Sequence, residues 1–253
     1  MAEGEEQDVA KFTQNEVWDD TLRLIRTHWV ALVAIAGVFN FFPVLLVNHY
    51  VPWPEPGPDV EAGRALAIMG AFLRQNIIWF VLQSFVIMIG SAAMLRLVFA
   101  RGVTVGGALV FGAMLLPVYS LMLVFINLGV LIGLVLLIVP GLYVWGRLFP
   151  AGAVMVAEDR RHPIETIRRS WALTEGHGWL ILGLYILVAL SGAVLLFAVE
   201  KLTGIVFILA AGQELGRFLT EIVLALLTAA VATLVTMLSA AVYRAVAPRK
   251  PEL

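Results

Sequence analysis

Arg147 and Glu221 lie inside long apolar stretches of the sequence and are the first candidates for chemistry. The stretches are long enough to cross a bilayer, where an ionisable side chain costs a few kcal/mol or more and is a functional candidate by default. If the fourth span starts at Gly141, Arg147 lies about 9 Å below its boundary at 1.5 Å per residue, and Glu221 lies at a similar depth in the sixth span. We therefore predict an ion pair between them. The pair either ties two helices together or lines a cavity for an anionic ligand; alternatively, each side chain reaches the interface unpaired.

Motifs typical of enzymes are not found in the sequence. No cysteine is present, which excludes disulfides, thiolate metal sites and cysteine nucleophiles. The four histidines fall near predicted membrane boundaries without metal-ligand spacing, and the sequence has no phosphate-binding glycine loop and no nucleophile elbow. The net charge of −1 gives no basic field for nucleic acid. We expect no enzymatic activity, no cofactor, no metal and no nucleic-acid partner.

The composition indicates a membrane protein. Hydrophobic residues make up 61% of the chain and charged residues 14%, whereas soluble domains carry about 25% charged residues. Five stretches contain no Asp, Glu, Lys or Arg: 27–54, 75–95, 102–146, 176–199 and 222–243. A spanning helix needs about 20 mostly apolar residues, so the third stretch can hold two spans and the others one each.

Six membrane helices are therefore predicted, near Trp29–Tyr50, Gln75–Phe99, Leu115–Ile138, Gly141–Ala157, Gly178–Val199 and Phe218–Tyr243. The turn between the third and fourth spans has two alternatives, Pro140-Gly141 and Asn127-Leu128-Gly129. We favour Pro140-Gly141, because a turn at Asn127 makes the third span too short. The apolar segment 204–216 is about half a bilayer long and is either interfacial or re-entrant.

The distribution of Lys and Arg predicts the orientation. With six spans both termini lie on one side, and that side carries most of the 17 basic residues: Lys11, Arg23, Arg26, Arg96, Arg101, Arg160, Arg161, Arg168, Arg169, Arg244, Arg249 and Lys250. The other side carries Arg64, Arg74, Lys201 and Arg217. Basic residues are enriched in cytoplasmic loops, so both termini are predicted to be cytoplasmic.

Short amphipathic segments precede the first and fifth spans. In each, apolar residues that include tryptophan recur at helical spacing and arginines lie elsewhere on the helix, which suits the headgroup layer. A weaker version, 104–109, precedes the third span. The pattern allows a three-fold internal repeat of one interfacial helix and two spans. Such helices either brace the bundle or bind anionic lipid or a partner, and the residues expected at the headgroups are Trp18, Arg23, Arg26, Trp171, Arg168 and Arg169.

The predicted fold class is an all-α integral membrane protein with six transmembrane helices and cytoplasmic amphipathic interfacial helices. We expect residues 1–13 to form a disordered acidic cytoplasmic tail, residues 14–247 to form one six-helix transmembrane domain, and residues 248–253 to form a second cytoplasmic tail. The acidic, polar start of the chain is unlike a cleavable signal peptide.

Two runs carry a resemblance to a known family. They are Ile138–Leu148, IVPGLYVWGRL, and Pro163–Trp179, PIETIRRSWALTEGHGW. They resemble the membrane-domain family of glycerophosphoryl diester phosphodiesterases, with Thr166-Ile167 where that family usually has Ala-Leu. The resemblance implies a bacterial six-helix inner-membrane protein. Some members continue into a soluble phosphodiesterase domain, which we do not expect here because the sequence ends at Leu253, and stand-alone members have no assigned activity.

The leading hypothesis is a non-enzymatic bacterial inner-membrane protein that engages lipid, or a membrane-protein partner or second copy, through its cytoplasmic amphipathic helices. The alternative is a small-molecule or lipid transporter, or a permease subunit, with a polar cavity near Arg147 and Glu221. A cavity that brings water to Arg147 would favour the transporter, and a dry, packed bundle would favour the first hypothesis.

Overall fold

The structure is a computed structural model, and it describes residues 13–54, 57 and 59–248. Every regular element in these residues is a helix, and a helix satisfies its backbone hydrogen bonds internally, as a membrane span must. The elements are α1 (Gln14–Ala36), η1 (Gly37–Phe41, a π-helix), α2 (Phe42–Tyr50), α3 (Ala62–Phe99), α4 (Val105–Leu136), α5 (Ile138–Leu148), α6 (Ala151–Ala157), α7 (Pro163–Leu173), α8 (Gly178–Ala211) and α9 (Gln213–Val246).

Six helical segments are long and apolar enough to cross a membrane, which confirms the expected all-α membrane fold class. They are Gln14–Tyr50, Ala62–Phe99, Val105–Leu136, Ile138–Ala157, Gly178–Ala211 and Gln213–Val246. Each overlaps one predicted span, and most run beyond it because the polar flanks contain no early stop signal. The segment 204–216, predicted to be interfacial or re-entrant, is instead the end of α8, a turn at Gly212 and the start of α9. Gly212 has φ +81°, a conformation that favours glycine.

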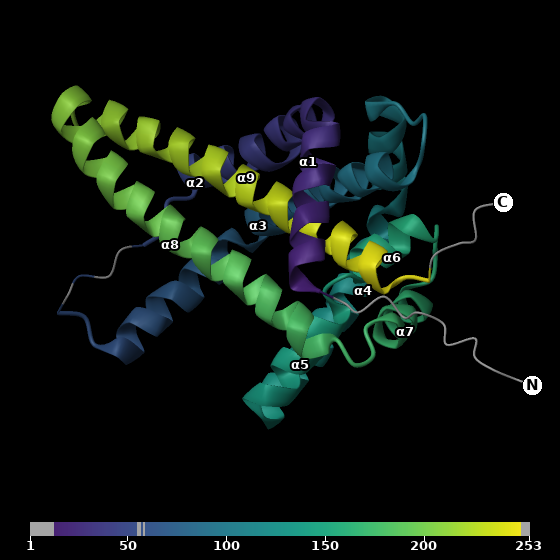
Figure 1. Cartoon of the computed structure of the whole chain (residues 1–253). Coiled ribbons are helices and arrows are strands. Elements are labelled where there is room, and N and C mark those ends of the chain that lie inside the picture. The colour runs from purple at the N-terminus through teal and green to yellow at the C-terminus, as the bar shows by residue number, and fades with distance from the viewer. Residues whose placement is uncertain (1–12, 55–56, 58, 249–253) are drawn as a thin grey trace, which may run out of the picture.

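The α8–α9 hairpin defines two ends of the helix bundle. α8 and α9 pack side by side as an antiparallel hairpin whose tip is Gly212 (Figure 1). α1 begins and α9 ends at the other end of this hairpin, where Arg244 Nη1 lies 3.4 Å from Asp20 Oδ2. We call this the terminal end and the end near Gly212 the opposite end.

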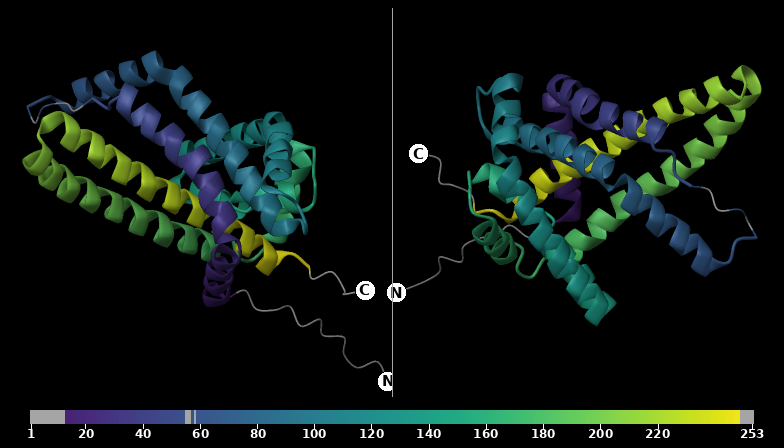
Figure 2. Two further views of the ribbon diagram at one scale, coloured as in Figure 1. Left: turned by 90° about the horizontal axis from the view of Figure 1, so that it is seen from above. Right: turned by 180° about the vertical axis from the view of Figure 1, so that it is seen from behind.

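The first segment does not run straight. α1 crosses α9 steeply, and the chain then bends so that α2 lies along α9 (Figures 1 and 2). Between them, η1 makes a π-type bond from the Phe42 N–H to the Gly37 carbonyl, one residue before Pro43. A π-helix inserts one extra residue into a helical turn and recurs at functional sites.

The turn between the third and fourth spans lies at Leu137, the extended residue that separates α4 from α5. This is close to the favoured Pro140-Gly141 and places Pro140 in the first turn of α5. Asn127, the alternative, lies inside α4 and donates to the Leu123 carbonyl. The predicted span Gly141–Ala157 is not one helix, because Pro150 separates α5 from α6.

The expected interfacial helices take three different forms. Before the fifth span, α7 is a separate helix that begins at Pro163, a residue suited to a first helical turn. Before the first span, the amphipathic segment is the beginning of α1 and continues into it. The predicted weaker version at 104–109 is not a separate helix: Thr104 Oγ1 accepts from the Gly107 N–H and caps α4 directly.

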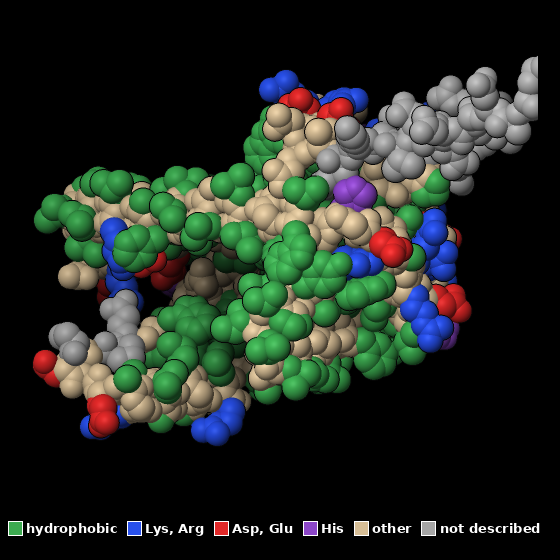
Figure 3. All heavy atoms as spheres, turned by 60° about the horizontal axis from the view of Figure 1, so that its bottom comes forward, with side chains coloured by type: hydrophobic (Ala, Val, Ile, Leu, Met, Phe, Trp, Pro, Cys, Tyr) green, Lys and Arg blue, Asp and Glu red, His purple; other side chains and the backbone are tan. Residues whose placement is uncertain are grey.

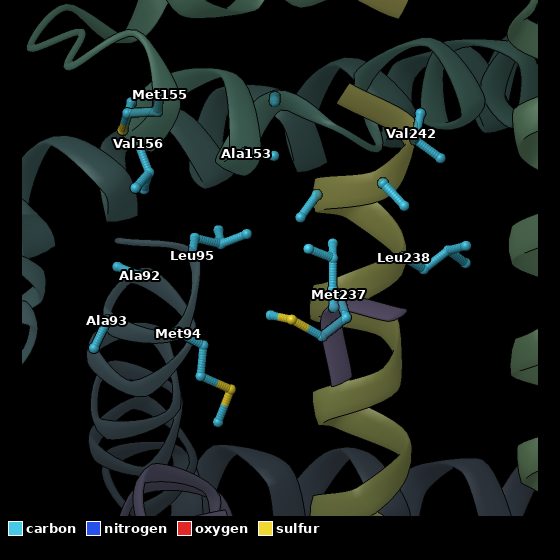
Figure 4. Packing of buried hydrophobic residues seen from close by; sticks show 14 of the residues in the cluster. Ala92, Ala93, Met94, Leu95, Ala153, Met155, Val156, Met237, Leu238 and Val242 are labelled. Carbon is cyan, nitrogen blue, oxygen red and sulfur yellow. The ribbon is translucent and has the colours of Figure 1, made fainter. Parts of the chain in front are cut away.

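The hydrophobic core lies toward the terminal end. Its buried residues come from α1, α3, α4, α6, α8 and α9, and Figure 4 labels those contributed by α3, α6 and α9. α6 is the most enclosed element, since Ala153, Met155 and Val156 are fully buried. The predicted tails, 1–13 and 248–253, fall almost wholly outside the described residues, which include only Thr13 and Pro248 of them.

Candidate functional site

Arg147 is buried at the last turn of α5, with 5% of its surface exposed. Its guanidinium donates three hydrogen bonds: from Nε to Thr174 Oγ1 (2.9 Å), from Nη1 to the Tyr143 hydroxyl (2.8 Å) and from Nη2 to the Trp171 carbonyl. The guanidinium also lies 4.3 Å from the centre of the Trp171 ring, within cation–π range. Arg147 therefore joins α5 to α7 and to the connection that leads into α8.

Backbone contacts reinforce this junction. Ser170 Oγ donates to the Arg147 carbonyl at 3.1 Å. Thr174 Oγ1 lies 3.0 Å from the same carbonyl and 2.8 Å from the Ser170 carbonyl, and it donates to one of them. A Cβ added to Gly178 would lie 2.7 Å from Arg147 Cδ, so the glycine leaves room for the arginine side chain. We call Arg147, Tyr143, Trp171, Thr174 and Gly178 the arginine junction.

A second polar cluster lies beside the junction, just after α6. Glu158 accepts from Arg160 Nε at 2.6 Å and from Arg169 Nε at 3.1 Å, and it also receives a bond of 3.4 Å from the Tyr243 hydroxyl of α9. Partial burial raises the pKa of Glu158, but the hydrogen bonds and charges of the two arginines outweigh it and leave that pKa below its ordinary value. We call these four residues the glutamate cluster.

The outer face of α7 presents a mixed stripe. Ile164, Arg168 and Trp171 recur at i, i+4 and i+7, the spacing of one helical face, and all three are exposed. The sequence pattern predicted that the arginines lie elsewhere on the helix than its apolar residues, whereas Arg168 shares this exposed face with Ile164 and Trp171. Arg169, which is also predicted to lie at the headgroups, places its Nε 3.1 Å from Glu158 Oε1.

The beginning of α1 contributes the other predicted interfacial residues at the same end. Trp18 is half-buried, and Arg23 and Arg26 are exposed. Arg23 Nη2 lies 3.5 Å from Asp20 Oδ1, and the same carboxylate contacts Arg244 of α9. In the face shown in Figure 3, green hydrophobic side chains are spread over the broad surface, and most charged side chains lie at its margins, at the right, at the top and toward the left.

The predicted Arg147–Glu221 pair is not formed. Glu221 lies near the start of α9, at the opposite end, where its Oε2 is 2.8 Å from Nδ1 of His49. The His49 ring in turn packs edge-to-face against Phe218. Arg147 lies beside the beginning of α8, at the terminal end. The prediction assumed that α5 starts at the membrane boundary of the opposite end, whereas the helix is short and Arg147 reaches the α7 connection.

The sequence did not indicate most of the junction, and of the glutamate cluster it indicated only Arg169, without its contact to Glu158. Tyr143 stands four residues before Arg147, a spacing that could have indicated contact within one helix. Thr174 and Glu158 bind partners 27 and 11 residues away, and no local pattern marks those contacts. Asn40 of η1 is a further polar residue, 1% exposed, whose amide oxygen and nitrogen have no hydrogen-bond partner in the described part of the chain.

Comparison of the chain with protein-family models, with curated proteins and with solved structures gives no match.

Proposed function

We propose that this chain is a non-enzymatic bacterial inner-membrane protein with cytoplasmic termini, and that it engages anionic lipid through α7. The observation that carries the proposal is the exposed stripe of Ile164, Arg168 and Trp171 on a short helix that connects two membrane segments. Tryptophan suits the headgroup layer, an apolar side chain enters the edge of the hydrocarbon, and an arginine binds a phosphate.

The arginine junction supports this role because it holds α7 on the side that faces the bundle. Arg147 binds the Trp171 carbonyl and Thr174, so α7 keeps its exposed face directed away from the bundle. The glutamate cluster holds a second point of the same helix through Arg169. Both clusters bind α7 to neighbouring helices, and their polar atoms are engaged with one another, which favours a structural task over catalysis.

The orientation rests on the basic residues. Arg160, Arg161 and Arg168 lie in or beside α7 at the terminal end, and most Lys and Arg of the sequence belong to that side. Basic residues favour the cytoplasmic side, so α7 would face the anionic lipids of the inner leaflet. The resemblance to the phosphodiesterase membrane-domain family agrees with a bacterial inner membrane. A membrane-protein partner or a second copy on the same stripe is the competing occupant.

The structure does not contain the arrangement of Arg147 and Glu221 on which the transporter hypothesis was based. The hypothesis required Arg147 and Glu221 to face one polar cavity, whereas each binds other residues at a different end of the bundle. We therefore propose no transported ligand.

The test compares two arginines at the same end. Arg168→Gln and the control Arg101→Gln are each purified in lipid nanodiscs that contain phosphatidylglycerol and phosphatidylcholine, and retained lipids are counted by native mass spectrometry. A basic residue near an anionic surface contributes about 1 kcal/mol, so Arg168→Gln should weaken retention of phosphatidylglycerol by about fivefold. Arg101, exposed in the turn between α3 and α4, should have little effect when replaced.

Equal losses in both variants would indicate diffuse charge attraction and contradict a role for α7. Unchanged retention of phosphatidylglycerol in both variants would contradict the proposal. Binding of a second copy of the chain at α7, with no lipid there, would also contradict it. Circular dichroism on both variants checks that the helices are retained.

A further inference from the structure

A groove opens between the start of α1, the first half of α8 and the middle of α9. Its volume is about 580 Å³, and it is lined mainly by leucine and valine side chains of α8 and α9. Midway along it, Ser191 is exposed, and the buried Gly192 lets Val231 of α9 pack closely against α8, since a Cβ on Gly192 would lie 3.1 Å from Val231 Cγ1. None of the lining residues is Asp, Glu, Lys or Arg. The groove therefore suits an apolar, uncharged part of a ligand.

The polar groups of the groove gather at one end. Gln14, Asn15 and Trp18 lie where α1 begins, and Gln14 Nε2 donates to the Leu180 carbonyl near the start of α8 at 3.1 Å. Leu195 and Val231 line its far part. The groove is thus polar at the terminal end and apolar toward the membrane interior, the arrangement that an amphipathic ligand requires.

The length of the groove matches one leaflet. Along α8 its lining runs from Leu184 to Leu195, and 11 steps of 1.5 Å give about 16 Å. Half of a hydrocarbon core of about 30 Å is about 15 Å. Leu187 and Leu195 are 63% and 48% exposed on the rim of the groove, so the rim would face acyl chains in a bilayer.

We propose that this groove holds one acyl chain of a phospholipid from the leaflet at the terminal end, with the headgroup beside Gln14 and Asn15. Empty space of this size would forfeit packing contacts, and acyl chains are the medium that surrounds the rim. Because the lining has no charged residue, occupancy is independent of headgroup charge. The inference does not rest on α7, whose proposed ligand is an anionic headgroup.

The test uses a phosphatidylcholine probe that carries a photoreactive diazirine near the end of one acyl chain. The protein is reconstituted into vesicles that contain the probe, irradiated, digested and mapped by mass spectrometry. Labelling should concentrate on Leu195 and Val231, which line the far part of the groove. Ser191→Phe should remove most of it, because the ring fills the middle of the groove, and the smaller Ser191→Leu should remove part of it. Ser191 is exposed, so neither change disturbs a buried contact.

Ala230→Leu provides the matched control. Ala230 is exposed on α9 and lines a neighbouring groove, of about 310 Å³, farther along α1, which shares only Leu234 with the first groove. Its replacement should leave labelling of Leu195 unchanged. Equal labelling of all exposed membrane helices, unaffected by Ser191→Phe, would show boundary lipid only and overturn the proposal. A disulfide dimer formed by Ser191→Cys in vesicles would place a second copy there and also overturn it. Arg168→Gln should not change this labelling, so failure at α7 and failure at the groove are distinguishable.

Discussion

At the scale of single residues, Arg147 is held by polar but uncharged acceptors. Its three hydrogen bonds go to two hydroxyl groups and one backbone carbonyl, and its guanidinium lies over an indole ring. Hydrogen bonds to a charged group contribute about 1.5–3 kcal/mol, more than bonds between neutral groups. Arginine suits this site because its planar guanidinium spreads its donors over three nitrogens in a fixed fork, whereas the three donors of lysine sit on one nitrogen at the end of a flexible chain.

The junction predicts which double-mutant cycle shows coupling. Arg147→Met should lower the free energy of unfolding by about 2 kcal/mol, because buried acceptors lose a charged donor. Arg147→Met with Thr174→Val should be less destabilising than the sum of the single changes by at least about 0.5 kcal/mol. Arg147→Met with Glu221→Gln should be additive within about 0.5 kcal/mol, since the two residues bind different partners. Reversible unfolding in mixed micelles measures all three.

Thr236→Val is the control for the hydroxyl, because Thr236 Oγ1 donates to the Ala232 carbonyl of its own helix. Coupling between Arg147 and Glu221 would contradict the arrangement described above.

Asn40 gives a prediction of the opposite sign. Its buried amide has no hydrogen-bond partner among the described residues, and an unsatisfied buried polar group costs about 1–3 kcal/mol. Asn40→Leu should therefore raise the free energy of unfolding, by about 1 kcal/mol. Asn127→Leu is the control, since Asn127 is exposed and already donates to the Leu123 carbonyl. A loss of stability in Asn40→Leu would show that the amide binds water or another group that the apolar side chain cannot replace.

The sequence indicated Arg147 as a candidate residue but did not indicate its partners. Arg147 stood out because a charge inside an apolar stretch is visible in a linear pattern. Its pairing with Glu221 was wrong because depth along two helices does not fix which helices are neighbours. The choice of partner depends on α5 ending early at Pro150 and on the approach of Gly178, neither of which follows from hydrophobicity.

At the scale of elements, the connection from α6 to α7 is the best-defined polar structure outside the spans. Glu158 binds Arg160 of the connection, Arg169 of α7 and Tyr243 of α9, so one carboxylate holds three segments together. A helix at α7 was predictable from its amphipathic pattern, and Pro163 at its start and Gly176 after its end are the usual sequence signals for such bounds. It did not predict that adjacent arginines divide their tasks, with Arg169 bound to Glu158 and Arg168 exposed.

Glu158 predicts a dependence of stability on pH. Its folded-state pKa is lowered, so its contribution is fully present above the unfolded pKa of about 4.3 and is lost as the pH falls through the folded value. Glu158→Gln should reduce thermal stability at pH 7, and the difference from the unchanged protein should shrink below about pH 4. Asp159→Asn is the control, because Asp159 is exposed, its carboxylate lies 3.3 Å from Arg161, and asparagine tolerates the φ of +47° at this position. Thermal unfolding in detergent at both pH values checks this, and a difference that stays constant with pH would contradict it.

At the scale of the whole molecule, the packed core and both polar clusters lie toward the terminal end, while the α8–α9 hairpin projects to the opposite end (Figure 1). The six spans were predictable because an apolar stretch of bilayer length is a property of the chain itself. The three-fold repeat was harder to predict than the spans. Thr104 starts α4 without a separate interfacial helix, and the amphipathic segment of α1 continues directly into a span. Continuity between neighbouring helices depends on tertiary packing.

The placement of the connections gives the last prediction. The α3–α4 turn with Arg101 and the α7–α8 connection with Glu175 belong to the terminal end, and residues Gly57 and Glu214 belong to the opposite end. If the basic residues set the orientation, the terminal end is cytoplasmic. The chain has no cysteine, so labelling of a single introduced cysteine has no background.

In intact bacteria, Gly57→Cys and Glu214→Cys should react with a membrane-impermeant maleimide, whereas Arg101→Cys and Glu175→Cys should react only after lysis. The reverse pattern would invert the orientation and place α7 against the outer leaflet. Mixed reactivity within one end would mean that the helices do not all cross the membrane as assigned.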